Sequence, residues 1–147
     1  MAAILHDVCK YWPVERQAQV IREHGLPLDL LDYDKELWHA HAGAQVAKLD
    51  YNVVDEEILD AIRYHTSGRE AMTMLDKVVC LADYMEPGRD FPAVGHIREL
   101  ATHSLEKALL AGFDSTLEFL LSKGKRIYPL TVFTRNSLLL EIQEQDQ

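Results

Sequence analysis

Long apolar runs are absent from this sequence of 147 residues. No stretch approaches the roughly 18 uninterrupted apolar residues that a membrane span needs, and Met1–Leu5 is too short and lacks the flanking charge for a signal peptide. Cysteine is scarce as well, since Cys9 and Cys80 are the only two, both inside apolar stretches where a reduced thiol behaves as a small hydrophobic group. We therefore expect a soluble, cytoplasmic protein with no membrane partner and no disulfide framework.

Extended basic clusters are also lacking. The formal net charge is −9, and the longest basic stretch is Lys123–Arg126. A long phosphate backbone would be repelled overall, so nucleic acid is not an expected partner. A small anionic ligand is compatible with this charge, because a bound metal cation and a few placed Lys or Arg side chains set the local potential.

The sequence is rich in helical periodicity. Hydrophobic residues make up 48% of the chain, recur at helical spacing, and are interrupted where Pro and Gly end helices. The pattern predicts an all-α fold in one domain, residues 1–147. The expected helices run from the N-terminus to about Tyr11, over Val14–His24, Lys35–Asp50, from near Asp55 to Tyr64, from a Thr73 cap to about Tyr84, over Val94–Ala101, Ser104–Ser122 and from about Thr131, with a polar link at Asp29–Asp34.

Two acidic residues in apolar helices indicate chemistry. His6 and Asp7 follow Ala2–Leu5, and burying an adjacent imidazole and carboxylate is costly unless each has a partner. A metal ion would supply that partner, and Lys10 follows one turn later, where its ammonium could face a substrate oxygen. Asp83 repeats the anomaly at the end of another apolar helix. A buried His beside a helical Asp is common by itself, so the two sites together carry the argument.

Two further histidines belong to the same pattern. His39 precedes the small residues Ala40–Ala44, which let another helix approach closely, and His65 closes the helix that ends near Tyr64. Several helices each delivering imidazole or carboxylate are expected where a bundle builds a metal site. Ligands of this kind without thiolates favour iron, manganese or zinc over magnesium or calcium. His41, two residues from His39, is expected to point to another side of its helix.

These residues resemble a known family. The spacing of His6-Asp7, Lys10, His39, His65 and Asp83 is similar to that of the HD-domain phosphohydrolases, and closest to the branch of symmetrical bis(5'-nucleosyl)-tetraphosphatases of the YqeK type. The resemblance covers nearly the whole chain and is carried by Leu5–Lys10, Glu36–His39, Ala61–Arg69, Leu81–Asp90 and Ile127–Thr131. The His-Asp pair alone is not specific, but the segments together are.

The resemblance implies an all-α HD domain that cleaves diadenosine tetraphosphate into two molecules of ADP at an iron site. It implies metal ligands at His6, Asp7 and Asp83. Residues implied to contact the substrate, beside Asp7, are Lys10, His39, His65, Thr66, Arg89, Arg126, Tyr128, Pro129 and Thr131. In the wider group, residues equivalent to His39 and His65 can hold a second metal, and here phosphate contact is the favoured role. Asp7, Lys10, His39 and His65 thus count as catalytic together with His6 and Asp83.

One departure from the family pattern stands out. Members carry a further His on a helix preceding the His-Asp pair, whereas here the pair begins at residue six. We expect the chain to be truncated at its N-terminus, with weaker metal affinity and reduced activity, although three protein ligands can hold a catalytic metal. An apolar face left by such a helix could drive homodimerisation.

Other functions stay open at this point. An HD nucleotidase or phosphodiesterase with another nucleotide substrate would share the fold, and so would a non-catalytic nucleotide or metal sensor. A plain helical interaction module would bind no metal. A cysteine nucleophile is disfavoured, because no strand-turn-helix elbow presents Cys9 and burial would raise its pKa.

Overall fold

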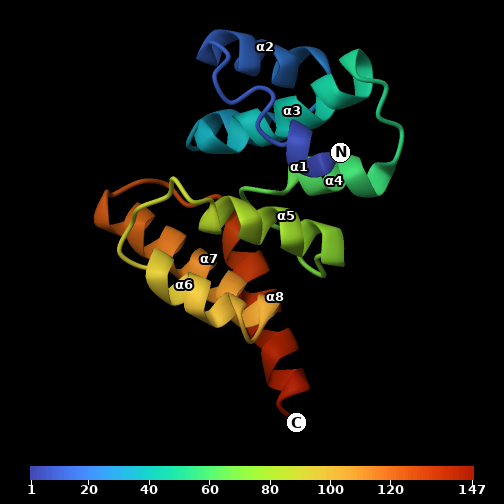
Figure 1. Cartoon of the computed structure of the whole chain (residues 1–147). Coiled ribbons are helices and arrows are strands. Elements are labelled where there is room, and N and C mark those ends of the chain that lie inside the picture. Colours follow the sequence, from blue (N-terminus) through green and yellow to red (C-terminus); the bar gives the residue numbers. More distant parts are fainter. The chain divides into compact units, whose positions relative to one another are not determined.

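The computed structural model describes residues 1–147 as an all-α protein, as predicted, with eight α-helices, one 3₁₀ helix and no strands (Figure 1). The elements are α1 (Ala2–Leu5), α2 (Val14–Glu23), the 3₁₀ helix η1 (Leu28–Asp32), α3 (Glu36–Asp50), α4 (Glu56–Arg63), α5 (Met74–Met85), α6 (Val94–Ala101), α7 (Leu105–Ser122) and α8 (Pro129–Gln145). None of these helices combines the length and apolar character that crossing a membrane requires.

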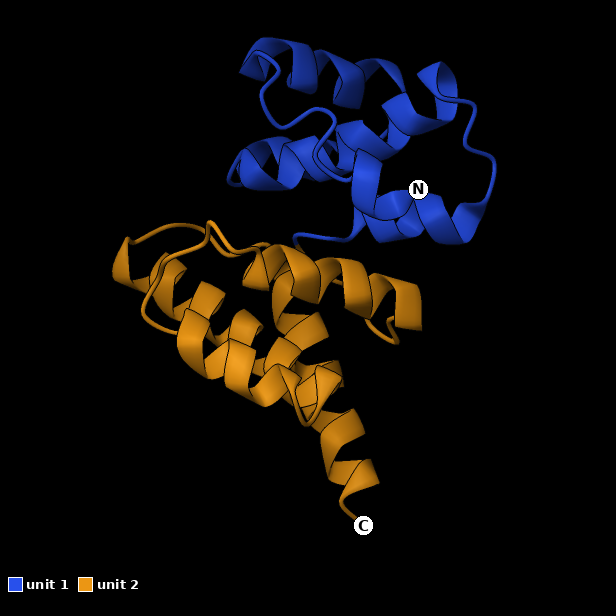
Figure 2. Ribbon diagram, in the orientation of Figure 1, with its two compact units in different colours: residues 1–66 blue, residues 67–147 orange.

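The helices fall into two compact units (Figure 2). Unit 1 is Met1–Thr66, which contains α1–α4 and η1, and unit 2 is Ser67–Gln147, which contains α5–α8. Each unit is described below by itself. The expectation of one domain over the whole chain stays a prediction.

In unit 1, helix α3 packs against both α2 and α4, while α1 packs against α4. Small residues make the close approach to α3 possible. A Cβ atom on Gly43 would lie 3.6 Å from the His6 carbonyl oxygen and equally close to side-chain carbons of Val8 and Ile62. The segment that carries His6 therefore lies directly against α3, as the run of small residues predicted.

In unit 2, the long helix α7 packs against α5, α6 and α8. Its buried residues Leu109 and Phe113 belong to a core that also contains Leu81 of α5, Ile97 of α6 and Leu138 of α8. One apolar cluster therefore draws on all four helices and holds α5, the helix of Asp83, in place.

Most helix ends lie where the sequence predicted them. Asp55 caps α4 by accepting a hydrogen bond from the Glu57 amide at 2.9 Å. Thr73 caps α5 in a reciprocal arrangement with Asp76. Gly25 and Gly124 follow α2 and α7 with φ of +66° and +64°, a conformation that favours glycine.

The prediction of one helix from the N-terminus to Tyr11 is wrong. Helix α1 ends at Leu5, and residues 6–11 form successive turns. Within it, the amides of Val8 and Lys10 bond carbonyls three residues back, at 3.1 and 3.0 Å, rather than four. The segment is thus wound more tightly than an α-helix. Its Cys9 carbonyl accepts a hydrogen bond from the Gln17 side chain of α2 instead of from an amide of a continuing helix.

The expected polar link at Asp29–Asp34 is also partly structured, because Leu28–Asp32 forms η1. Its Leu30 is fully buried, and the Leu30 carbonyl accepts a hydrogen bond from the Trp38 indole at 2.7 Å. Both cysteines are free and buried, as predicted. Burial raises the pKa of the Cys9 thiol to about 12, so this thiol stays protonated and unreactive at neutral pH.

Candidate metal centre

Asp7 is the centre of a cluster of basic side chains in unit 1. Its Oδ2 lies 3.3 Å from His6 Nε2 and 3.6 Å from Lys10 Nζ. Its Oδ1 lies 3.2 Å from His39 Nε2 and 3.5 Å from His65 Nε2. Five of the residues singled out in the sequence are therefore brought together by folding of unit 1.

Three elements deliver these side chains. His6 and Asp7 lie in the turn after α1, His39 is one turn inside α3, and His65 follows the C-terminal end of α4. The His39 and His65 rings are buried, and their Nε2 atoms lie 3.0 Å apart. The ring of His65 also meets the His6 ring edge to face, with centroids 5.0 Å apart. The imidazoles thus converge edge-on, with ring nitrogens inward.

Backbone carbonyls select the tautomers of two of these rings. His6 Nδ1 lies 2.7 Å from the Ala3 carbonyl oxygen, and His65 Nδ1 lies 2.7 Å from the Ile62 carbonyl oxygen. A carbonyl only accepts, so each Nδ1 carries a proton and each Nε2 of the neutral ring offers a lone pair. Both Nε2 atoms face Asp7. This is the second-sphere arrangement that orients metal-ligating histidines in proteins.

The electrostatics of Asp7 fit a cation site. Burial by itself raises the pKa of Asp7, but the neighbouring imidazoles of His39, His6 and His65 outweigh it and hold the pKa far below its ordinary range. Asp7 Oδ1 is buried and makes no hydrogen bond of good geometry. One ligand atom each from Asp7, His39 and His65 lies within 4.8 Å of the others. An orphaned carboxylate oxygen facing imidazole nitrogens is what a bound transition metal would satisfy.

Asp83 belongs to unit 2, where it occupies the last turn of α5. Arg89 Nη2 donates a hydrogen bond to Asp83 Oδ1 at 3.1 Å, so these two predicted site residues do contact each other. The Asp83 side chain keeps 21% of its surface exposed. The Asp83 carboxylate is thus partly exposed, and a cation other than the Arg89 guanidinium could reach it.

The remaining predicted residues are spread over both units. Thr66 follows His65 at the end of unit 1. Arg126 is exposed on the loop between α7 and α8, Tyr128 is the N-cap of α8, and Pro129 is its first residue. Thr131 is buried in the first turn of α8. In unit 2, the predicted nucleotide contacts of Arg126–Thr131 therefore cluster at one helix N-terminus.

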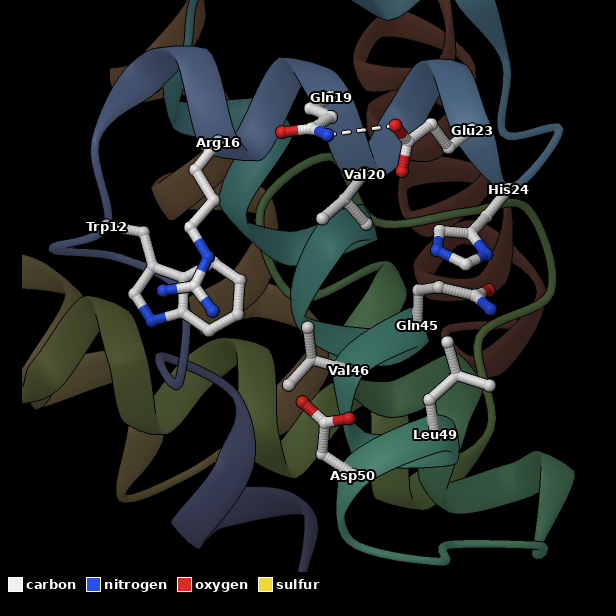
Figure 3. A pocket seen from close by; sticks show the side chains of 10 residues that line it. All are labelled: Trp12, Arg16, Gln19, Val20, Glu23, His24, Gln45, Val46, Leu49 and Asp50. Carbon is white, nitrogen blue, oxygen red and sulfur yellow. Dashed lines mark hydrogen bonds between the residues drawn. The ribbon is translucent and has the colours of Figure 1, made fainter.

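A surface groove in unit 1 contains none of the predicted site residues. It is a groove of about 240 Å³ between α2 and α3, with Val20 and Val46 between rims of polar side chains (Figure 3). The Arg16 guanidinium lies 3.6 Å from the centre of the Trp12 ring at one end of this groove (Figure 3). Arg16 therefore covers one face of the Trp12 indole.

Comparison with known proteins places this geometry in a family. A family model of the HD domain matches residues 1–88, which includes all of unit 1 and helix α5 with Asp83. The chain belongs to the HD-domain family. The matched range contains the His-Asp pair, both converging histidines and the second aspartate.

Relatives of this HD-domain chain carry a specific name. The chain is 47% identical over 139 residues to the symmetrical bis(5'-nucleosyl)-tetraphosphatase of Bacillus subtilis, covering 95% of this chain and 75% of that protein. It is 43% identical over 141 residues to the enzyme of the same name from Halalkalibacterium halodurans, covering 96% and 75%. Similarity at this level extends beyond the HD match into α6–α8.

A solved structure has the same fold. A protein from Clostridium acetobutylicum, described as a predicted HD superfamily hydrolase involved in NAD metabolism, superposes with a TM-score of 0.88 at 37% identity. The superposition covers 95% of this chain and 75% of that one. This HD-domain chain therefore shares its fold with a solved protein of the HD superfamily.

One supporting residue of this HD-domain protein escaped the sequence analysis. The buried Gln17 side chain on α2 donates hydrogen bonds to the Cys9 carbonyl at 3.0 Å and the Trp12 carbonyl at 3.1 Å. It thereby satisfies carbonyls of the turn that carries Asp7 and Lys10. A glutamine in a helix is usually expected on the surface. The sequence indicated its burial only through its spacing of four from Ile21, which puts both residues on one face of α2.

Proposed function

We propose that this protein is a metal-dependent symmetrical bis(5'-nucleosyl)-tetraphosphatase that cleaves diadenosine tetraphosphate into two molecules of ADP. The observation that carries the proposal is the cluster around Asp7, in a chain 47% identical to a protein of that name. Both the carboxylate and the imidazoles of the cluster are oriented by other groups before any ligand arrives, which is the preorganisation that catalysis requires.

We assign the cation to His6, Asp7 and Asp83, and we propose iron, with manganese or zinc as alternatives, because the ligands are nitrogen and oxygen without thiolate. When bound, the cation polarises a phosphoryl oxygen and makes a nucleophile available from water near neutral pH. The tautomer of His6, set by the Ala3 carbonyl, gives its Nε2 the lone pair that a metal ligand needs. A cytoplasmic location and a homodimer stay predictions from the sequence.

The chain's own side chains would bind the polyphosphate and manage its charge. Lys10 holds its ammonium 3.6 Å from Asp7, at the edge of the cluster, where it meets an anionic phosphoryl oxygen. Arg89 supplies a guanidinium that can bind two oxygens at once. Thr66, Arg126, Tyr128, Pro129 and Thr131 are assigned to the nucleotide and its remaining phosphates. These contacts offset the charge that develops as the anhydride bond breaks.

His39 is our candidate for the proton donor. The lone pair of His65 Nε2 faces His39 Nε2 at 3.0 Å, so the proton between them resides on His39. His39 thus presents an N–H next to Asp7, and in its doubly protonated form it can pass this proton to the leaving oxygen of ADP and return to the neutral imidazole. His65, whose Nδ1 stays bonded to the Ile62 carbonyl, orients His39 in this scheme.

A second cation is the alternative role for these two histidines. It is favoured by the orphaned Asp7 Oδ1, which faces His39 Nε2 and His65 Nε2 at 3.2 and 3.5 Å. Metal content decides between the roles. Two equivalents of metal per chain would make His39 and His65 ligands, whereas one equivalent that persists in a His39→Ala variant would leave them as phosphate contacts.

Product analysis tests the proposal. The metal-loaded protein is incubated with diadenosine tetraphosphate, and the nucleotides are separated by chromatography. We expect ADP as the sole product, and an Asp7→Asn variant should lose activity by more than about a hundredfold because it loses its anionic ligand. Asp29→Asn, an exposed change of the same kind in η1, is the matched control and should retain activity.

Other outcomes would favour the competing functions. ATP and AMP as products would contradict symmetrical cleavage. Turnover of other nucleotides but not of diadenosine tetraphosphate would favour an HD nucleotidase or phosphodiesterase. Binding of ADP and metal with no turnover would favour a sensor, and a purified protein that binds no metal would leave only a helical interaction module.

A further inference from the structure

The turn that follows α5 controls where Arg89 points. Arg89 N–H donates to the Glu86 carbonyl at 2.8 Å, which closes a four-residue turn with Pro87 and Gly88 at its central positions. Proline is favoured at the first central position because its φ is preset for a turn. From the end of this turn the Arg89 side chain reaches back to Asp83 at 3.1 Å. The ion pair therefore depends on the position of the whole turn.

Arg98 of α6 holds both ends of that turn. A single guanidinium nitrogen, Nη2, faces three carbonyl oxygens, at 3.4 Å from Met85, 3.1 Å from Glu86 and 3.2 Å from Arg89. The first of these carbonyls ends α5, and the other two begin and end the turn. Arg98 thus connects α6, the end of α5 and the residue that contacts Asp83.

The physical reason for an arginine at this point is electrostatic. The last carbonyls of α5 have no partner within the helix, and the C-terminal end of a helix carries partial negative charge. Asp83 adds a full negative charge in the same last turn. A cation that donates to these carbonyls stabilises the helix end, and the planar guanidinium does so in a fixed geometry that a flexible ammonium does not match.

We propose that Arg98 is a positioning residue that fixes the Glu86–Arg89 turn and so presents the Arg89 guanidinium at Asp83 for binding of the substrate's phosphate oxygens. The inference rests on the proposed function for the identity of the substrate, and on contacts within unit 2 for the geometry. Arg98 itself is not assigned to the substrate. It acts through the backbone of the turn.

Three variants of the full chain test this role. Arg98→Met removes the donors and keeps much of the side-chain volume, and Arg98→Lys keeps the charge. Arg135→Met is the matched control. Arg135 of α8 donates to Asp114 of α7 at 2.8 Å, so this substitution also removes an arginine contact of unit 2, at positions far from the turn in sequence. Circular dichroism confirms that each variant is folded before it is compared.

The first readout needs no substrate or metal. Hydrogen exchange of the Arg89 amide reports whether the turn is closed, because this amide is bonded to the Glu86 carbonyl. We expect exchange at least about tenfold faster in Arg98→Met than in wild type. The Arg135→Met control should exchange at the wild-type rate, and Arg98→Lys should fall between wild type and Arg98→Met.

The second readout is the division between KM and kcat for diadenosine tetraphosphate. Arg98→Met should raise KM about tenfold with a smaller change in kcat, since a misplaced Arg89 weakens phosphate binding. A merely structural defect would lower the folded fraction and hence kcat at unchanged KM. Equal exchange and equal KM in Arg98→Met and Arg135→Met would overturn the proposal, as would an Arg98→Lys variant worse than Arg98→Met in both.

Failure of the proposed function is separable from failure of this inference. Wild-type protein that does not hydrolyse diadenosine tetraphosphate would refute the substrate, while the exchange of the Arg89 amide would still decide whether Arg98 holds the turn. Conversely, an active wild-type enzyme whose Arg98→Met variant exchanges and binds like the control would keep the proposed function and reject the positioning role.

Discussion

At the scale of the residue, His41 has a different task from its neighbour His39. It is 4% exposed, and neither ring nitrogen has a hydrogen-bond partner. Its ring meets Tyr64 edge to face with centroids 5.9 Å apart, away from the Asp7 cluster, as its spacing from His39 predicted. Burial, followed by the nearby Arg63 and His65, lowers the pKa of His41 to about 4. His41 therefore stays neutral in the folded protein over the physiological range.

His41 should make unit 1 acid-sensitive. Between pH 6.5 and 4 the unfolded chain binds a proton that the folded chain does not, so the free energy of unfolding falls as the pH falls through this window. At pH 5 the loss from this residue is about 2 kcal/mol. We predict that, between pH 7 and pH 5, the free energy of unfolding falls by about 2 kcal/mol less in metal-free His41→Leu than in metal-free wild type. Urea unfolding at both pH values measures this difference.

The control for this prediction is His96→Asn, since His96 is exposed on α6. This variant should follow the wild-type pH dependence. If the pH dependence of His41→Leu also equals that of wild type, then His41 is not the group responsible for the acid sensitivity.

At the scale of the element, α5 is stabilised by polar contacts at both ends. Its start has the Thr73 capping box, to which Arg69 adds a hydrogen bond to Asp76 at 2.8 Å, and its end has Arg98. In the first turn, buried Lys77 donates to Glu106 of α7 at 3.1 Å and to Glu141 of α8 at 2.7 Å. These polar contacts, added to the apolar core, fix the helix that presents Asp83.

Replacing Lys77 should loosen this helix. Lys77→Met leaves Glu106 and Glu141 partly buried without their cation, and we expect the free energy of unfolding to fall by about 2 kcal/mol. A Lys77→Met, Glu106→Gln, Glu141→Gln variant should recover most of the loss, because the unpaired charges are gone. Urea unfolding at pH 7 measures both.

An exposed pair provides the comparison for this loss. Lys107 lies 3.6 Å from Asp146 with both side chains about half exposed or more, and Lys107→Met should cost less than about 1 kcal/mol. A Lys77→Met variant no less stable than Lys107→Met would show that the buried triad adds nothing to the packing of α5 against α7 and α8.

At the scale of the whole molecule, the net charge of −9 contrasts with the cationic side chains that lie beside the two candidate aspartates, one in each unit. Lys10 lies beside Asp7, and Arg89 lies beside Asp83. A polyanionic substrate is repelled by the surface at long range and bound only where these cations and the metal dominate the local potential. The global charge disfavours a long nucleic acid but is compatible with a nucleotide.

Metal should stabilise the whole chain. A cation that binds only the folded state adds about 2.7 kcal/mol when its concentration is a hundredfold above Kd, which corresponds to a rise in Tm of roughly 5–10 °C for a chain of this size. We predict this rise for manganese or ferrous iron by calorimetry, with reversal by a chelator. Asp7→Asn should lose most of it, while His24→Asn, an exposed change in the same unit, should keep it. An equal rise in both variants would place the metal elsewhere.

Some features of the site could be predicted from the sequence and others could not. Periodicity, caps and the anomaly of charged residues in apolar helices were sufficient to predict helices, the cap at Thr73 and the residues that gather around Asp7. The turn at residues 6–11 was missed, because the bonds from Gln17 that satisfy its carbonyls come from another helix. Arg98 was missed for the same reason, since its acceptors are backbone carbonyls, which have no sequence signature.

The sequence by itself determined the all-α class, most helix ends, the absence of a disulfide and the identity of the chemical groups, because these follow from local propensity and from side-chain type. Tertiary structure decided which atoms of those groups face each other. The unpaired oxygen of Asp7 that faces His39 and His65, and the carbonyls held by Arg98, depend on contacts between separate elements. Distances of that kind arise only once the helices pack.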